Sequence, residues 1–313
     1  MTDTQPENPY IIDDTGFEYE IDPHNRFTVP PMIYGSMPND GGNLIIEAAD
    51  YDAFIQREPR AQKYIHKFIG ADEFINNKIR YCLWLVDCPP NELKSMKLVY
   101  ERVKACRQYR LKSSRAATRK LADKAWLFGE IRQPDSDYIC VPRVSSENRR
   151  YIPMSWVSKD VIAGDAVQCI PNATLWLFGN LTSSVHMAWM RVVAGRLENR
   201  YRYSGSIVYN NFAFINADKK RRARIEAAAQ AILDARAKFP DASLADLYDE
   251  TIMPVELRAA HNENDAAVLD AYGYPADWNE TQIVSDLLYR YEALAKGNDL
   301  SKIAATSRRN FIN

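Results

Sequence analysis

The sequence predicts an α+β protein: a mixed or antiparallel sheet with packed helices, followed by an all-helical C-terminal domain. Short apolar runs separated by turn residues occupy much of the chain from about residue 32 to residue 212 and are typical of strands. A long basic run with helical spacing interrupts them. After about residue 216 the sequence becomes alanine-rich, with apolar residues at helical intervals.

We therefore expect three parts. Residues 1–30 are polar and rich in proline, which predicts an extended N-terminal arm or linker from a missing upstream domain. Residues 31–215 would form the α+β domain. Residues 216–313 would form the helical C-terminal domain.

The elements follow in order. Residues 32–46 read as strand, loop and strand, a short helix begins near Asp50, and residues 79–87 suit a central strand that ends before Pro89. Asn91 could cap one helix from residue 92 to about residue 122. We expect further strands in these runs: 126–132, 138–144, 150–157, 167–178 and 201–212.

The remaining elements are helices. Thr182 or Ser183 could cap a helix that ends at Gly195. After residue 216 the pattern predicts a long helix over 219–239, stopped by Pro240, and further helical pieces over 243–274 and 280–294.

Composition excludes several classes of protein. No run of eighteen apolar residues could span a bilayer and no signal segment begins the chain, so we expect a soluble, cytoplasmic protein without membrane partners. The five cysteines show no Cys-x-x-Cys, which argues against a disulfide framework or a zinc site and favours buried apolar roles. No metal ligands are predicted.

Charge is distributed unevenly although the net charge is only −1. The run Arg102–Lys120 contains eight basic residues and no acidic residue. Such a run is the electrostatic pattern that a phosphate backbone favours, and a solvated basic helix face is the alternative. On the predicted helix, three- and four-residue steps bring together these side chains: Arg107, Arg110, Lys112, Ser114, Arg115, Arg119 and Lys120.

A polar ridge follows the strand at 138–144. Glu147 and Arg149 are two residues apart, so in an extended ridge both would point to the same side. A Glu and an Arg presented together match the cytosine amino group and the guanine acceptors of one G·C pair. An intramolecular ion pair between them is the alternative.

Enzyme motifs are missing from the sequence. It has no Gly-x-Ser-x-Gly elbow, no phosphate-binding Gly-x-x-x-x-Gly-Lys and no His-Glu-x-x-His, and no catalytic residue is predicted. His186 lies on an apolar helix, which favours a core histidine over a catalytic base. An autonomous hydrolase using Asp87 or His186 is the weakest hypothesis.

Nine segments, in order from about residue 30 to residue 275, resemble one known family. They are MPNDGGNL, KFIGADEFIN, RYCLWLVD, SSRAATRKLA, LFGEIRQPDSDY, PRVSSENRRYIP, LTSSVHMAWMRVVAGRL, YRYSGSIVYNNF and DARAKFPDASLADLYDETIMP. These blocks are similar to the MmeI-like restriction-modification enzymes, single chains that combine an endonuclease, an adenine-specific DNA methyltransferase, a target recognition domain and a C-terminal helical domain.

The resemblance implies that residues 31–215 are a DNA target recognition domain and that the chain, not catalytic by itself, recognises duplex DNA. A methyltransferase domain, in cis or in trans, would methylate adenine N6 with S-adenosylmethionine, and this chain would hold no cofactor. The block with Glu147 and Arg149 implies base reading, and Arg115 and Tyr151 lie near a second reading pair. The other six cationic or hydroxyl side chains of the basic run would hold phosphates.

A second hypothesis remains open on the sequence. The basic helix could meet an acidic protein, and the helical domain could dock a partner, which would make the chain a scaffold without sequence-specific DNA binding. A preference for one duplex sequence at fixed salt distinguishes the two hypotheses.

Overall fold

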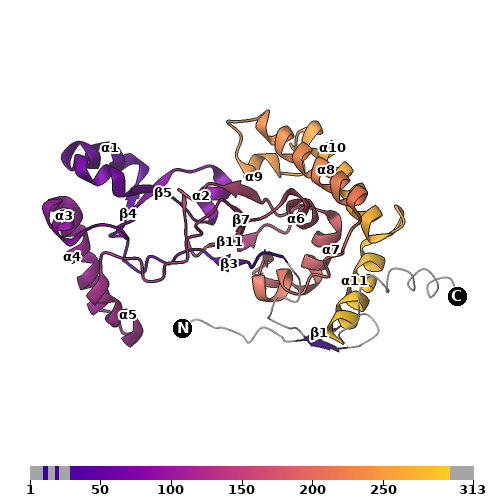
Figure 1. The fold of residues 1–313 in the computed structure, drawn as a ribbon, viewed down its shortest axis with the longest axis horizontal. Coiled ribbons are helices and arrows are strands. Elements are labelled where there is room, and N and C mark those ends of the chain that lie inside the picture. Colours follow the sequence, from indigo (N-terminus) through magenta and orange to yellow (C-terminus); the bar gives the residue numbers. More distant parts are fainter. Residues whose placement is uncertain (1–9, 13–17, 21–28, 297–313) are drawn as a thin grey trace. The chain divides into compact units, whose positions relative to one another are not determined.

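The computed structural model of the protein describes residues 10–12, 18–20 and 29–296 (Figure 1). The predicted N-terminal arm and the last residues of the predicted C-terminal domain lie mostly outside these ranges. The chain divides into two compact units. One, here the sheet unit, comprises Ile33–Pro142 and Ser155–Asn172; the other, here the helical unit, comprises Arg143–Met154 and the described residues among 1–32 and 173–313.

The sheet unit contains two four-stranded sheets. In the first, of order β10-β5-β6-β4, β6 pairs antiparallel with both neighbours and β10 runs parallel to β5. In the second, of order β3-β11-β7-β9, all pairs are antiparallel. The strands are β3 Ile33–Tyr34, β4 Ile45–Glu47, β5 Ile65–Ile69, β6 Arg80–Leu83, β7 Tyr138–Pro142, β9 Ser155–Val157, β10 Ile162–Ala163 and β11 Val167–Pro171.

The helices of the sheet unit pack around the first sheet. Val99, Val103 and Cys106 recur at helical intervals on α4 and are buried in the same core as Leu83 of β6. The helical elements are α1 Ala48–Arg57, η1 Pro59–Tyr64, α2 Ala71–Asn76, α3 Pro90–Ser95, α4 Lys97–Leu111, α5 Ala116–Lys120 and η2 Leu121–Lys124.

The helical unit contains all the remaining helices of the described residues. Figure 1 shows α8 and α10 side by side, and α6 packs on α8 where a Cβ at Gly179 would lie 2.6 Å from Ile225. The helical elements are α6 Leu175–Leu181, α7 Ser184–Val193, η3 Gly205–Tyr209, α8 Lys219–Ala237, α9 Leu244–Leu247, α10 Val255–Tyr272 and α11 Glu280–Ala295. A small sheet of order β12-β13-β8 joins β8 Val144–Ser145, β12 Gly195–Leu197 and β13 Arg200–Arg202.

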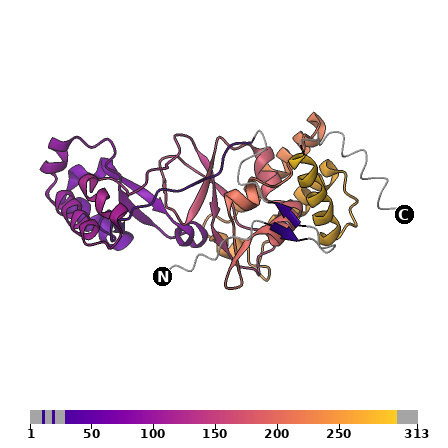
Figure 2. The same cartoon turned by 90° about the horizontal axis from the view of Figure 1, so that it is seen from below.

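The predicted α+β class is confirmed, with a mixed and an antiparallel sheet and a helical C-terminal region. Ser183 caps α7 by accepting from the backbone N–H of His186, as the sequence predicted. The long helix ends before Pro240, also as predicted. The described pieces of the N-terminal arm, β1 Tyr10–Ile12 and β2 Glu18–Glu20, pair antiparallel and appear as indigo arrows in Figure 2.

Several predicted elements are wrong. The single helix from residue 92 to residue 122 is three helices, because Met96 (ψ 89°) leaves the helical region and residues 112–115 separate α4 from α5. Pro89, not Asn91, precedes the first of them. Residues 126–132 form no strand, since only Glu130 makes a bridge, to Met37.

Two apolar runs switch from strand to helix within a few residues. The run at 167–178 is β11 followed by the start of α6, where Thr174 Oγ1 accepts from the backbone N–H of Leu177. The run at 201–212 leaves β13 and continues into the π-helical turn η3. Periodicity over such short runs does not separate a buried strand from a buried helix.

Three further findings bear on the sequence predictions. All five cysteines are buried and unpaired, as predicted. In the part of the chain that the structure describes, no helix has the length and apolar character needed to cross a membrane. The helical unit also includes Arg143–Met154, α6 and α7, which lie before the predicted domain boundary at residue 216.

Candidate nucleic-acid interface

The basic surface lies where α4 ends and α5 begins. We define it as the exposed side chains Arg107, Lys112, Ser114, Arg115, Arg119 and Lys120. Arg119 Nη1 donates to the carbonyl oxygens of Ser113 and Ser114 at 2.8 Å each and closes the turn between the helices. One turn earlier Lys104 pairs with Glu101 at 2.8 Å, whereas no described carboxylate pairs in this way with the five cations of the basic surface. Their positive charge therefore faces solvent uncompensated.

Arg110 is a correction to the predicted phosphate ligands. Its side chain has no exposed surface, and its guanidinium donates to backbone carbonyl oxygens at 2.7 to 3.1 Å. The acceptors are Pro38, Asn39, Leu121, Lys124 and Leu127. Arginine has five N–H donors, so this set saturates the group and leaves nothing for a phosphate.

The loop that Arg110 holds supports the basic surface from beside α4. Gly41 adopts φ +66°, and a Cβ there would lie 2.6 Å from the ring of Tyr109. Asp40 is buried and accepts from the backbone N–H of Gly42 at 3.1 Å, while Asn39 Nδ2 donates to Thr118 Oγ1 of α5 at 3.4 Å. The cations of the basic surface therefore lie beside a loop, residues 38–42, that is held by hydrogen bonds to α4 and α5.

The ridge is a turn, which corrects the extended geometry predicted for it. The backbone N–H of Arg149 donates to the carbonyl of Ser146 at 3.3 Å, and that of Asn148 donates to Ser146 Oγ at 3.2 Å. Glu147 and Asn148 are the exposed central residues, and Arg149 is half-buried. Within residues 29–296 no ion pair joins Glu147 to Arg149, so the alternative of a structural pair is not what the structure has.

Arg149 lines a cavity of about 400 Å³ on the helical unit. The other lining residues are Ser146, Asn148, Ala245, Tyr248, Asp249, Glu250 and Thr251. Burial lowers the pKa of Arg149, and the negative charge of Asp249 acts in the opposite direction. Arg149 thus lines one cavity with residues 249–251, which lie between α9 and α10, while Glu147 and Asn148 are exposed to solvent.

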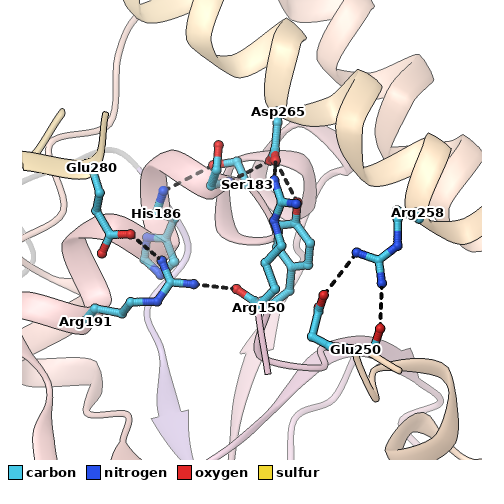
Figure 3. Close-up of polar contacts among 10 residues, drawn as sticks. Arg150, Ser183, His186, Arg191, Glu250, Arg258, Asp265 and Glu280 are labelled. Atoms are coloured by element: carbon cyan, nitrogen blue, oxygen red, sulfur yellow. Dashed lines mark hydrogen bonds and ion pairs between the residues drawn. The ribbon is translucent and has the colours of Figure 1, made fainter. Parts of the chain in front are cut away.

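Tyr151 is a further correction, because the family resemblance placed it near a base-reading pair. It is 2% exposed, its hydroxyl donates to Asp265 Oδ2 at 2.6 Å, and its ring stacks on His261 with a centroid distance of 4.1 Å. Arg150 reaches the same carboxylate oxygen at 3.5 Å (Figure 3). With its hydroxyl and ring both engaged, Tyr151 presents nothing to a base in this structure.

The predicted residues thus fall into two sets. Arg115 and the phosphate candidates belong to the sheet unit, and Glu147, Arg149 and Tyr151 belong to the helical unit. Sequence reasoning missed Asp265, His261 and Arg236, which contact the ridge segment from more than 80 positions away. Of these only Arg236 falls in a block of the family resemblance, DARAKFPDASLADLYDETIMP.

The residues of the hydrolase hypothesis do not form a reactive site. His186 is fully buried, its Nε2 lies 2.8 Å from Tyr203 Oη, and burial lowers its pKa to about 3, so it is the core histidine that the sequence predicted. Asp87 is exposed on a turn. Across the described ranges no three His, Cys, Asp or Glu side chains are arranged to hold a metal ion.

Comparison with known protein families covers nearly all the described chain. The model of the MmeI target recognition domain matches residues 20–216, and the model of the MmeI C-terminal domain matches residues 216–298. The chain belongs to the MmeI family. The family resemblance predicted from the sequence is confirmed.

Two similar proteins support this family assignment. DNA methyltransferase A of Bacillus subtilis (strain 168) is 36% identical over 289 residues, which cover 92% of this chain and 33% of that protein. The structure of the type IIL restriction-modification enzyme MmeI in complex with DNA matches with a TM-score of 0.85 and 43% identity, covering 87% of this chain and 36% of that one. The chain therefore spans about a third of the length of these relatives.

Proposed function

We propose that the chain is the sequence-specific duplex DNA recognition module of an S-adenosylmethionine-dependent adenine-N6 DNA methyltransferase or restriction enzyme. The observation that carries this proposal is the match of residues 20–216 to the MmeI target recognition domain, together with the uncompensated basic surface in that range. The likeness to MmeI in complex with DNA supports the same reading.

The basic surface would supply affinity without sequence preference. Five exposed cations near one another can neutralise phosphates and release counterions, and hydroxyl groups such as that of Ser114 also bind phosphate oxygens. Arg119 would present a guanidinium that its bonds to Ser113 and Ser114 already hold in place. Arg115 sits in the same surface, so we assign it to phosphate contact unless the bound DNA brings a base to it.

The ridge would supply the sequence preference. Glu147 and Asn148 stand at the exposed tip of a turn, with Arg149 next to them. A glutamate accepts from the cytosine amino group and an arginine donates to guanine O6 and N7, so one turn can address both bases of a G·C pair. Asn148, the other exposed residue of the turn, has the amide that pairs with adenine.

Catalysis would lie elsewhere. We assign the cofactor and the chemistry to a methyltransferase domain in cis or in trans, which would flip the target adenine out of the duplex that this chain holds. An enzyme of this kind would meet its DNA in the cytoplasm. By itself the chain would bind DNA and not methylate it.

The ridge is tested by exchanging its charges. The double variant Glu147→Arg, Arg149→Glu should change the preferred base pair at one position of the bound sequence, because it exchanges the donor and the acceptor that face the two bases. A mismatched base pair costs about 1–3 kcal/mol of binding free energy, so the change is measurable. Binding to a panel of duplexes with single base-pair substitutions, at fixed salt, measures this.

The chain offers a matched control for that exchange. Glu198 and Arg200 are also two residues apart at a hairpin and form an exposed ion pair at 2.7 Å. Exchanging them keeps the net charge and should leave the preferred sequence unchanged. Equal loss of binding to every duplex in the ridge variant would count against base reading.

A further inference from the structure

The segment Arg150–Met154, which follows the ridge turn, is bonded to three helices of the helical unit. The carbonyl of Arg150 accepts from Arg191 of α7 at 2.8 Å, and the backbone N–H of Ile152 lies 3.4 Å from the sulfur of Met187 on the same helix. The carbonyl of Met154 accepts from Arg236 of α8 at 2.6 Å. By contrast, among the described residues the turn Ser146–Arg149 makes two longer hydrogen bonds, both to Ser146, at 3.2 and 3.3 Å.

Asp265 of α10 is the centre of this attachment (Figure 3). Its Oδ1 accepts from the backbone N–H of Ser184, the first residue of α7, at 2.6 Å. Its Oδ2 accepts from the hydroxyl of Tyr151 at 2.6 Å and lies 3.5 Å from Arg150 Nη2. The carboxylate is buried, and each of these donors offsets part of the desolvation that raises its pKa.

A second route closes on the same segment. His261 lies one helical turn before Asp265, stacks on Tyr151 and shares a hydrogen bond of 2.8 Å with the hydroxyl of Tyr248. Tyr248 also accepts from Arg236, the residue that binds the carbonyl of Met154. Both routes join residues far apart in the sequence and end on residues 150–154, the segment that follows Arg149. A change in either route would therefore shift the segment from which the turn projects.

We infer that Asp265 is a positioning residue for base reading: through Tyr151 and Arg150 it fixes the orientation of the turn Ser146–Arg149. Discrimination at one base pair then depends on a buried carboxylate in the C-terminal part of the chain. This inference rests on the proposed function of the ridge. Reading groups must be held to within a fraction of an ångström, which a turn with two weak local bonds cannot do by itself.

The variant Asp265→Asn tests it in the whole chain, since the amide keeps the shape and removes the charge. We expect discrimination at the base pair read by the ridge to fall about tenfold. This is the usual size of the energetic coupling between residues that contact one another, as Asp265 and Tyr151 do. Discrimination at the other positions and the salt dependence of binding should not change. Tyr151→Phe is the second variant, for the case in which Asp265→Asn does not fold. It removes only the hydroxyl that binds Asp265 and should reduce discrimination at the same base pair.

Asp286→Asn is the matched control. Asp286 is also buried, accepts from the hydroxyl of Tyr274 at 2.6 Å and pairs with Arg290, but these partners lie outside the ridge segment. It should lower stability without changing discrimination at any position.

The outcomes separate the two proposals. Unchanged discrimination in folded Asp265→Asn and Tyr151→Phe overturns the positioning role while the proposed function stands. A drop in stability alone, as expected for Asp286→Asn, overturns it in the same way. A wild-type chain that shows no sequence preference overturns the proposed function and the inference with it.

Discussion

The basic surface and the ridge are built in opposite ways. The cations of the basic surface come from fourteen consecutive positions, 107–120, and the bond that fixes Arg119 is to carbonyls five and six residues away. The turn of the ridge has four residues, Ser146–Arg149, and the residues that follow it are held by helices 35 to 115 positions away. In the proposed function, the charge that would bind phosphates is thus encoded locally, whereas the geometry that would read bases depends on α7, α8 and α10 of the helical unit.

The difference has a functional sense. A phosphate contact tolerates a mobile side chain, because the attraction between charges is long-ranged and carries no sequence information. A base contact needs directional hydrogen bonds, which fail if the donor moves. We expect variants near the basic surface to change affinity for all duplexes, and variants behind the ridge to change preference among duplexes.

The largest effect is expected at the buried arginine behind the basic surface. Arg110→Met removes the shared donor of five carbonyls and should destabilise the sheet unit by about 3–5 kcal/mol, since unpaired buried acceptors keep their desolvation cost. Urea denaturation measures this. Arg107→Met, three residues earlier and exposed, should change stability by less than about 0.5 kcal/mol. Similar values for the two variants would show that Arg110 is not a structural anchor.

The second largest effect is expected from acid, which should destabilise the helical unit that holds the ridge. Burial lowers the folded-state pKa of His186 to about 3, so this group stabilises the helical unit above its unfolded pKa of 6.5, and the stability is lost as pH falls from there toward 3. Burial of His261 acts with the same sign. Between pH 7.5 and pH 5 the contribution of His186 should fall by about 2 kcal/mol.

His186→Gln retains a polar partner for Tyr203 and does not titrate. The variant should therefore lose less stability than the wild type over that pH range, measured as the shift in urea midpoint. An identical pH dependence in both proteins would mean that His186 is not held neutral.

The smallest effect is expected at the basic surface itself. Arg119→Ala should weaken binding to all duplexes similarly and reduce the slope of log affinity against log salt by about one. Lys104→Ala, which removes a cation already paired with Glu101, should reduce the slope less. If Arg119→Ala leaves the slope unchanged, Arg119 contacts no phosphate.

The sequence predicted features that depend on local patterns. The fold class, the Ser183 cap and the exposed cations follow from residue type and spacing, which tertiary packing did not override. The single helix from residue 92 to residue 122 failed because its charge pattern continues through Ser113 and Ser114 while the backbone does not.

The failure at Arg110 has a physical signal within the sequence. Val99, Val103, Cys106 and Arg110 form one helical stripe, so the arginine is in phase with buried residues. Arg236 continues the stripe of Ile225, Ala229 and Ile232 in the same way and is also buried. An arginine in phase with an apolar stripe should be assigned to the core before it is assigned to a ligand.

The anchoring of the ridge could not be predicted from sequence spacing. Asp265 and Tyr151 are 114 positions apart, and neither has a neighbour that marks it as a partner of the other. The extended ridge failed for a smaller reason, since Ser146 accepts from the two residues that follow Glu147 and bends the backbone. Turn formation by a serine of this kind competes with strand pairing.

The central claim, that the chain selects a duplex sequence, is tested most directly by binding the chain to a pool of randomised duplexes at fixed salt and sequencing those retained. The account predicts that the retained duplexes share one sequence element. It also predicts that raising the salt concentration weakens binding to preferred and other duplexes alike and leaves their ratio nearly constant. A retained pool indistinguishable from the input would contradict it and would favour a scaffold whose basic surface docks an acidic partner.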